Sequence, residues 1–397
     1  METGSRREGL NFNPMDTLKT DILIGYGTAA RLYMTAGPFS AELQTQLLHR
    51  RLGKANATVC ASEARPGPAR QTLERPDSAI CGGPNPSTCR IPDFAIRGFT
   101  IAAIMETLFD RHRELRKVAP VEILVGHPSA RLRNPMVNCH AWTAPIPDGG
   151  VIGIEDGLYV SSPEFTYLQM AWGAPVVRLA MLGSELCGSF LIDGKALPKR
   201  KPVTSIEEIS SFLSAVEASL SEHPWIAPPA VARARNALRY VVGEGRSPFE
   251  IACALMLGMP TRLGGFGLGM PVLNPALDVT VRRDGIRKTV KIHPDMLWAG
   301  RKLAVEYDSD EHHMSGRQRG RDSDRAILLR DNGYTVVQIT TSQLCSYRLL
   351  ENVVRHIIGT SFGKRRLARF EADAMRFKPG REKLLGELID IARNGCR

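Results

Sequence analysis

The chain has 397 residues, of which 43% are hydrophobic, so it is long enough for two domains with ordinary buried cores. It has no apolar run of the roughly 18 residues that a membrane span needs, and its start lacks the apolar region of a secretory signal, so a soluble cytoplasmic protein is expected. The formal net charge of +11 favours polyanionic partners such as nucleic acid, although many basic proteins bind none.

The eight cysteines are scattered, and none forms a Cys-x-x-Cys pair. Cys60, Cys81 and Cys89 fall in one irregular stretch, and Cys139 directly precedes His140, so a zinc site is one interpretation. Zinc sites usually pair their ligands at short spacing, and we therefore favour free thiols in a reducing compartment.

Basic residues cluster in three runs, over 111–117, 198–201 and 364–369. Each run alone is typical of a solvated surface. Beside a nuclease site, the same runs would extend a phosphate-binding surface.

The first part of the chain predicts a tail and an N-terminal domain. Residues 1–17 are polar and predict a disordered tail, and 18–242 predict a mixed α/β domain for recognition or partner binding. Within this domain, 21–48 predicts mostly helix, whereas the proline-rich 55–92 predicts a long irregular segment.

Helices and strands alternate in the rest of this domain. Residues 94–117 predict a helix, and the β-branched Val121–Val125 and Val151–Val160 predict strands. The sequences Ser161-Ser-Pro-Glu164 and Ser205-Ile-Glu-Glu208 predict helix starts that are closed by capping boxes.

The domain boundary is placed at the glycines of 243–246, which follow a predicted helix over 228–242. Behind it, Ser247-Pro-Phe-Glu250 predicts the start of a helix that runs to about Gly258, because proline is favourable in a first turn. The glycine-rich 264–269 lacks the Gly-Lys-Ser/Thr ending of a phosphate-binding loop, and no strand leads into it. It is therefore expected to be a flexible connection.

The C-terminal domain, over 247–359, has an alternating pattern that is typical of an α/β layered fold. After the first helix we predict three strands, a helix, a fourth strand and a last helix that is capped by Thr341 or Ser342. Their ranges are 277–281, 289–297, 302–307, 320–332, 334–340 and up to Ile358. A basic helical tail over 360–397 is expected to follow.

The turn between the second and third of these strands places two carboxylates opposite each other. If Gly300 and Arg301 are its two central residues, as the glycine suggests, Asp295 pairs with Glu306. Their Cβ atoms would then lie about 5 Å apart, and Asp308 would share the face of Glu306. A turn centred one residue away would separate the pair.

Like charges that face each other destabilise a sheet, so this pair suggests a compensating cation. Hard oxygen ligands at such a spacing suit Mg²⁺ or Mn²⁺. The sequence therefore predicts a metal site that centres on Asp295 and Glu306.

The same region resembles a known nuclease family. The motifs that carry the resemblance are His293-Pro-Asp295, Leu303-Ala-Val-Glu-Tyr-Asp308, His312-His313, Asp322-Ser-Asp-Arg325 and Gly333-Tyr-Thr-Val-Val-Gln-Ile-Thr340. In order and spacing they resemble the very-short-patch-repair-type branch of the PD-(D/E)xK endonuclease superfamily. The resemblance covers 247–359 and implies a restriction-endonuclease-like domain, with a mixed sheet flanked by helices.

The resemblance implies roles for individual residues. Asp295 and Glu306 would be metal ligands, and Glu250 would be a further acidic member of the site. His312 or His313 would lie near the scissile phosphate or a metal-bound water.

Asp308 stands where the wider superfamily has its lysine. A lysine stabilises charge on the phosphate, and an aspartate cannot, although it could bind a metal or act as a base. Glu-x-Asp is nevertheless usual in this branch.

The implied chemistry is hydrolysis of a phosphodiester bond in DNA. A bound metal would polarise the phosphate and supply a water of lowered pKa, and His312 or His313 could assist proton transfer. Arg325 could pair with Asp322 or Glu306 or reach a phosphate oxygen, and Arg317 and Arg321 are assigned to nucleic-acid contacts.

Structural roles compete with several of these assignments. Glu250 also fits a capping box with Ser247, and Asp322 and Arg325 have the spacing of a surface ion pair. The two histidines belong to a polar loop that could be only solvated. Gln338 could point into the site or lie at a solvent-exposed strand edge.

The N-terminal half carries a weaker resemblance. Residues 21–30, 158–167 and 182–188 are similar to the region that precedes nuclease domains in bacterial proteins of the AbiEi-type antitoxin and regulator family. A helical partner domain without such a role explains these residues equally well.

Two functions follow. The first is a bacterial two-domain, metal-dependent endonuclease that acts on DNA. The second is a non-catalytic nucleic-acid-binding regulator, antitoxin-like, that keeps the nuclease fold as a scaffold. The intact acidic residues favour the first, because they would be costly without a metal.

Overall fold

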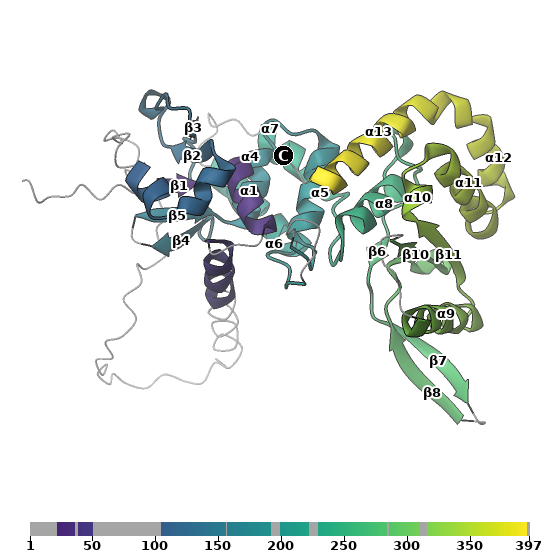
Figure 1. Ribbon diagram of the computed structural model, residues 1–397. Coiled ribbons are helices and arrows are strands. Elements are labelled where there is room, and N and C mark those ends of the chain that lie inside the picture. The colour runs from purple at the N-terminus through teal and green to yellow at the C-terminus, as the bar shows by residue number, and fades with distance from the viewer. Residues whose placement is uncertain are drawn as a thin grey trace, which may run out of the picture.

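The structure is a computed structural model that describes residues 22–35, 39–50, 105–155, 157–191, 199–221, 229–283, 286–309 and 316–394. Two sheets, each with its own helices, form the two halves of an elongated molecule (Figure 1). The predicted tail 1–17, the irregular 55–92, and His312 and His313 lie outside the described residues.

The N-terminal half is built on a five-stranded mixed sheet of order β3-β2-β1-β5-β4. Its strands are β1 (Ile22–Ile24), β2 (Val121–Val125), β3 (Val137–Ala141), β4 (Val151–Glu155) and β5 (Leu158–Ser161). The predicted strand at 121–125 and the antiparallel hairpin of β4 and β5 are confirmed. The prediction missed β1, because three buried apolar residues carry no periodicity that separates strand from helix.

Helices cover this sheet. They are α1 (Tyr26–Met34), α4 (Pro163–Met170), α5 (Val176–Leu186), α6 (Ile206–Ser221) and α7 (Pro229–Leu238), and 39–50 are also helical. Ser162, rather than Ser161, caps α4 by accepting a hydrogen bond from the Phe165 amide. Glu164 is therefore too close to the cap for the predicted capping box, and instead it accepts a hydrogen bond from Thr204.

The predicted helix over 94–117 is wrong in its described part. A π-helical turn, η2 (Met105–Asp110), and a 3-10 turn, η3 (Arg113–Val118), stand there instead. The basic run at this place is partly neutralised, because Arg111 pairs with Glu155 and Arg116 pairs with Asp110.

The predicted domain boundary at 243–246 falls in the connection between α7 and α8 (Pro248–Gly258). The hydrophobic core does not stop there, since one cluster of buried side chains extends from Ile22 to Ala392. The helix α5 of the N-terminal half packs directly on α8. The two sheets therefore share one continuous apolar interior.

The C-terminal half contains a four-stranded mixed sheet of order β11-β10-β9-β6. Its strands are β6 (Val272–Leu273), β9 (Met296–Trp298), β10 (Leu303–Asp308) and β11 (Thr335–Thr340). The pair β10–β11 is parallel, and the pairs β9–β10 and β6–β9 are antiparallel. The α/β class is confirmed for this half.

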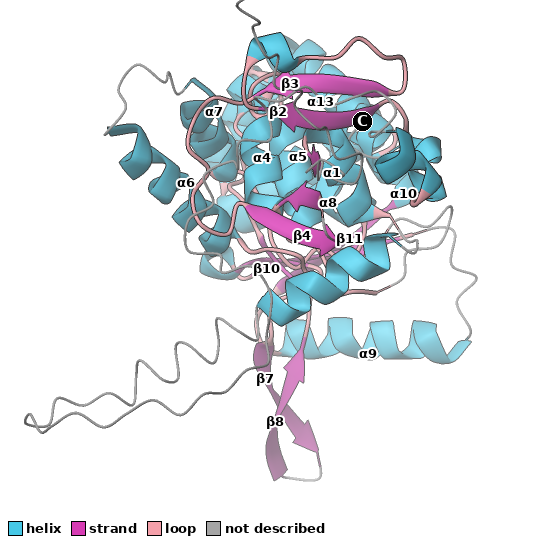
Figure 2. Ribbon diagram, turned by 90° about the vertical axis from the view of Figure 1, so that its left-hand side faces the viewer, coloured by secondary structure: helices cyan, strands magenta, loops and turns pink. Residues whose placement is uncertain are grey.

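A separate two-stranded ribbon, β7 (Leu277–Arg283) and β8 (Ile286–Ile292), extends away from the body beside α9 (Gly316–Asp331) (Figures 1 and 2). The strand predicted over 289–297 is thus divided between β8 and β9. The division falls at Pro294, which has no amide hydrogen to donate to a ladder.

The last helices are α10 (Thr341–Leu344), α11 (Tyr347–Ile357), the π-helical η7 (Ile358–Phe362), α12 (Lys364–Ala372) and α13 (Ala374–Asn394). Thr340 caps α10 in a capping box with Gln343, and Ser346 precedes α11, so the single predicted helix is two. The predicted basic tail is helical, but α13 packs along α8 and buries Leu384 and Leu388. None of the helices in the described ranges has the length and apolar character to cross a bilayer.

Candidate functional site

The turn between β9 and β10 sets the register of the acidic pair. Trp298 pairs with Leu303, and the ladder ends at Met296 opposite Val305, one step before the predicted pair of Asp295 and Glu306. Beyond the last ladder pair, Asp295 Oδ2 accepts a hydrogen bond of 2.9 Å from the amide of Tyr307. The side chain of Asp295 is therefore held against the backbone of β10.

The turn itself differs from the prediction. Ala299–Arg301 forms a 3-10 turn, and the left-handed residue is Lys302, with φ of 45°, rather than Gly300. The loop has four residues, of a kind that is usually built around a type I turn, and it gives the same register as the predicted two-residue turn.

Glu250 is buried at the start of α8, with 4% of its surface exposed. Ser247 Oγ accepts a hydrogen bond from the Glu250 amide, as the predicted cap requires. The Glu250 carboxylate accepts hydrogen bonds from Asn274 Nδ2 at 2.5 Å and from the Arg246 amide at 3.2 Å. The backbone amide of Asn274 in turn donates to the backbone carbonyl of Asp295 at 3.0 Å. Asn274 thus links α8 to the acidic pair.

The electrostatics of Glu250 report the closeness of Asp295. The pKa of Glu250 is raised to about 8. Burial is the larger cause, and the negative charge of Asp295 is the second. Because a nearby negative charge raises the pKa of a buried carboxyl, a cation at this place would lower the pKa of Glu250 again. The predicted capping box is therefore half formed: Ser247 caps α8, but the Glu250 carboxylate bonds with the Arg246 amide and Asn274 and lies beside Asp295.

Neighbouring side chains contact the carboxylates of Glu306 and Asp308. Arg325 on α9 donates from Nη2 to Glu306 Oε2 at 2.6 Å, which is one of the pairings that the sequence left open for Arg325; the side chain of Asp322 lies outside the described part. Gln338 on β11 lies opposite Glu306 in the parallel ladder and donates to Asp308 Oδ2 at 2.9 Å. Gln338 is exposed, yet it contacts the acidic cluster.

Sequence reasoning missed two features of this cluster. Asn274 belongs to no sequence motif that we recognised. It has a positive φ of 48°, a turn conformation that asparagine tolerates better than most residues. Tyr307 alternates to the other face of β10, where its ring stacks on Phe249 and its hydroxyl bonds with Thr341. These contacts fix β10 between α8 and α10.

The described residues contain no group of three or more His, Cys, Asp and Glu side chains that could hold a metal. Asp295 and Glu306 are a pair, and Mg²⁺ commonly takes one or two carboxylates and completes its shell with water and substrate phosphate. Glu250 is buried and Asp295 is half-buried, and the negative charge of Asp295 raises the pKa of Glu250, an effect that a nearby cation would counter. Among the proposed nucleic-acid contacts, Arg317 and Arg321 belong to α9, but their side chains lie outside the described part.

Among the described residues, the structure adds no further ligands to the alternative zinc site at Cys139 and His140. Cys139 is a free thiol, and the Nε2 atom of His140 lies 3.3 Å from Glu122 Oε1 while its ring stacks on Tyr26. Cys60, Cys81 and Cys89 are outside the described residues.

The arrangement around β9 and β10 is thus an acidic cluster of Glu250, Asp295, Glu306 and Asp308 with a guanidinium at one side. No protein family, curated protein or solved structure matches the chain.

Proposed function

We propose that the chain is a metal-dependent phosphodiesterase of the endonuclease kind that acts on DNA. The observation that carries the proposal is the buried Glu250 beside Asp295, which directly precedes β9, the neighbour of the strand that carries Glu306. When bound by Asp295 and Glu306, Mg²⁺ or Mn²⁺ supplies charge for the phosphate and a water of lowered pKa.

The chain's own residues prepare this chemistry. The Tyr307 amide orients Asp295, and Arg325 orients Glu306, so both carboxylates are preorganised. Arg325 is also near enough to the cluster to pair with a substrate phosphate. Asp308, fixed by Gln338, is a carboxylate that can accept a proton. His312 and His313 are proposed to assist proton transfer.

The basic surface supports DNA as the substrate. The ribbon of β7 and β8 carries the exposed Arg287 and Lys288, and a two-stranded β-ribbon fits the major groove. The chain as a whole has a net charge of +11. Binding to phosphates is therefore expected to weaken steeply as salt concentration rises.

The test compares the nicking of supercoiled plasmid by the wild-type chain and by Glu306→Gln, with Mg²⁺ or Mn²⁺. The amide keeps the size of the side chain but removes its charge, so nicking is expected to fall by more than about 100-fold. Glu382→Gln, a carboxylate on α13 that pairs with Lys378, is the matched control and should nick like the wild type. Equal nicking by the wild type and Glu306→Gln contradicts the assignment.

A second function is supported by the ion pair of Glu306 with Arg325, which neutralises a carboxylate without any metal. In that case the chain is a non-catalytic nucleic-acid-binding regulator, antitoxin-like, whose N-terminal half binds a protein partner. Salt-sensitive gel shifts without cleavage of any DNA or RNA, under all metal conditions, would favour this function.

A further inference from the structure

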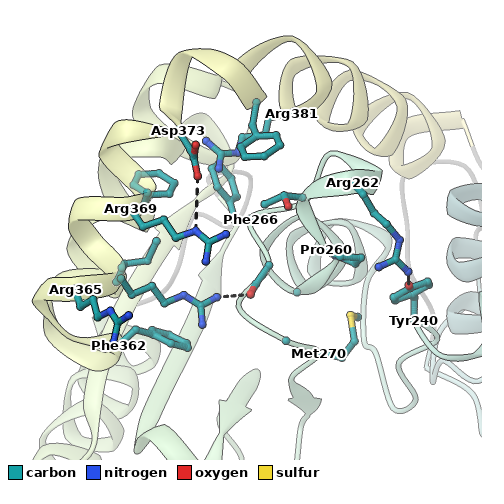
Figure 3. A pocket seen from close by; sticks show the side chains of 18 of the residues that line it. Tyr240, Pro260, Arg262, Phe266, Met270, Phe362, Arg365, Arg369, Asp373 and Arg381 are labelled. Atoms are coloured by element: carbon teal, nitrogen blue, oxygen red, sulfur yellow. Dashed lines mark hydrogen bonds and ion pairs between the residues drawn. The ribbon is translucent and has the colours of Figure 1, made fainter.

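A cavity of about 830 Å³ lies between the glycine-rich loop behind α8 and the helices η7, α12 and α13 (Figure 3). Among the described residues that line it, one carboxylate, Asp373, faces six arginines. These are Arg239, Arg262, Arg365, Arg366, Arg369 and Arg381. The basic run at 364–369 thus supplies one wall of a cavity.

Arg381 is the most buried of these arginines, with 2% of its surface exposed. Its guanidinium lies 5.0 Å from the ring centre of Phe266 and 4.9 Å from that of Phe370, which stabilises the cation through its contact with the rings. Its Nη1 atom is 3.9 Å from Glu351, and Nε and Nη1 have no hydrogen-bond acceptor among the described residues. The ion pair with Glu351 leaves other guanidinium donors over, so Arg381 contributes positive charge and N–H donors to the wall of the cavity.

The cavity is crowded with cations at its other side. Arg366 donates to the carbonyl of Gly267, and its guanidinium lies 4.6 Å from the ring centre of Phe362. Arg301 contacts the same ring at 5.0 Å. Burial, and then the charge of Arg301, lower the pKa of Arg366, so a bound anion would relieve this repulsion.

Two more arginines are each held by a contact that uses only part of the guanidinium's N–H donors. Arg262 donates from Nη2 to the hydroxyl of Tyr240 at 2.8 Å, and Arg369 Nε lies 3.8 Å from Asp373 (Figure 3). Each guanidinium has five N–H donors in a rigid fork, and these contacts use few of them. The cavity therefore offers several convergent donors with a large excess of positive charge.

We propose that this cavity binds a phosphate group, carried either by a nucleic-acid strand or by a free nucleotide. Guanidinium forks match phosphate oxygens in pairs, and several of them together suit an anion of more than one charge. The volume is in the range of ordinary ligand pockets and exceeds the needs of a lone phosphate ion. Phe362 and the arginine planes can stack on a base.

Recognition in this cavity is by side chains rather than by a backbone cradle. The amides of Phe266, Gly267 and Leu268 already donate to carbonyls of Met256, Met259 and Leu257 at the end of α8. The glycine-rich loop is therefore a hydrogen-bonded cap of α8 and differs from the flexible connection that its composition predicts. Its contribution is to place Phe266 and Gly267 in the wall.

The cavity is separate from the acidic cluster. It meets the turn after β9, where Trp298 Nε1 donates to Gly269 at 2.7 Å, whereas Glu306 lies at the far part of β10. None of the residues that line the cavity is Glu250, Asp295, Glu306 or Asp308. The inference does not depend on cleavage, although one strand could reach both places.

The test measures binding without any metal, in a chelator, so that it is independent of the proposed cleavage. The probes are inorganic pyrophosphate, ATP and a fluorescent single-stranded oligonucleotide with a 5′-phosphate. The wild type is expected to bind at least one of them. The double variant Arg365→Gln/Arg369→Gln should lose tenfold or more of this affinity, because both side chains line the cavity and supply positive charge. Both are exposed, so the variant should still fold.

The matched control is Arg376→Gln/Lys383→Gln, which removes the same charge from exposed positions of α13 outside the cavity wall. It should bind within about twofold of the wild type, as general electrostatics change little. Tighter binding of the oligonucleotide than of ATP assigns the phosphate to a strand, and the reverse order assigns it to a free nucleotide. Equal losses in both double variants, or no binding of any probe by the wild type, overturn the proposal.

Discussion

Glu250 has two effects on the folded chain, one through its position at the start of α8 and one through its charge. Its pKa of about 8 exceeds the ordinary value of 4.5, so the folded state retains a proton that the unfolded state releases between these values. The free energy of unfolding should therefore fall as pH rises through this window, and it should be highest below it.

Glu250→Gln should remove this dependence. In chelator, the wild type is expected to lose a few kcal/mol more stability than the variant between about pH 5 and pH 8.5, since each unit of pKa shift corresponds to about 1.4 kcal/mol. Urea denaturation at a series of pH values measures this, with the exposed Glu382→Gln as control. Parallel pH profiles for wild type and Glu250→Gln would show that the carboxylate titrates normally.

Single residues also show what the sequence could predict of the site. The alignment of Asp295 with Glu306 follows from local chain geometry, and the register of β9 on β10 ends one step before it, at Met296 opposite Val305. The amide that holds Asp295 and the asparagine that holds Glu250 depend on how α8 meets the sheet. Such contacts join positions that are far apart in sequence, and no local pattern encodes them.

At the level of elements, the ribbon of β7 and β8 is fixed to the body through the end of α9. The side chain of Asn332 accepts a hydrogen bond from the Thr280 amide and donates to the Thr280 and Leu328 carbonyls. One side chain thus braces a ribbon that otherwise extends away from the sheet (Figure 2).

Asn332→Ala should loosen this ribbon selectively, because it removes the two hydrogen bonds to Thr280 of β7, each worth about 1 kcal/mol. Hydrogen exchange should become faster at the amides of β7 and β8, while β10 and β11 stay protected. Asn352→Ala, on the exposed side of α11, is the control. Equal exchange in the ribbon of both variants would contradict the bracing role.

The boundaries of elements were predicted best where a side chain marks them. Ser247 caps α8 and Ser205 accepts from the Glu208 amide, as the sequence indicates. The division of one predicted strand into β8 and β9 was not foreseen, although Pro294 marks it. The alternation of apolar and polar residues cannot alone show that a chain leaves one sheet and enters another.

At the scale of the whole molecule, α13 belongs to the core rather than to a tail. It buries Leu384, Leu385 and Leu388 against the cluster that α8 shares with both halves. The α/β class was predictable from the alternation of elements. The continuity of the core was not, because it depends on which faces of distant helices meet.

Leu388→Ala should therefore destabilise the entire chain. Truncation of a fully buried leucine costs about 2–5 kcal/mol, a large part of the stability of an average protein. Met375→Ala, on the same helix with 78% of the side chain exposed, should change little. Thermal denaturation of both variants checks this, and a loss confined to the C-terminal half would show that α13 is peripheral.

The path of α13 has a thermodynamic consequence for the arginine-lined cavity. The helix carries Arg381 in the cavity wall and, farther along, Glu387 at 3.4 Å from Arg178 of α5 in the N-terminal half. A ligand that binds only the folded chain adds its binding free energy to the stability of everything that unfolds together with the site. Occupancy of the cavity should thus be readable at a distance, as slower amide exchange in the strands of the N-terminal sheet.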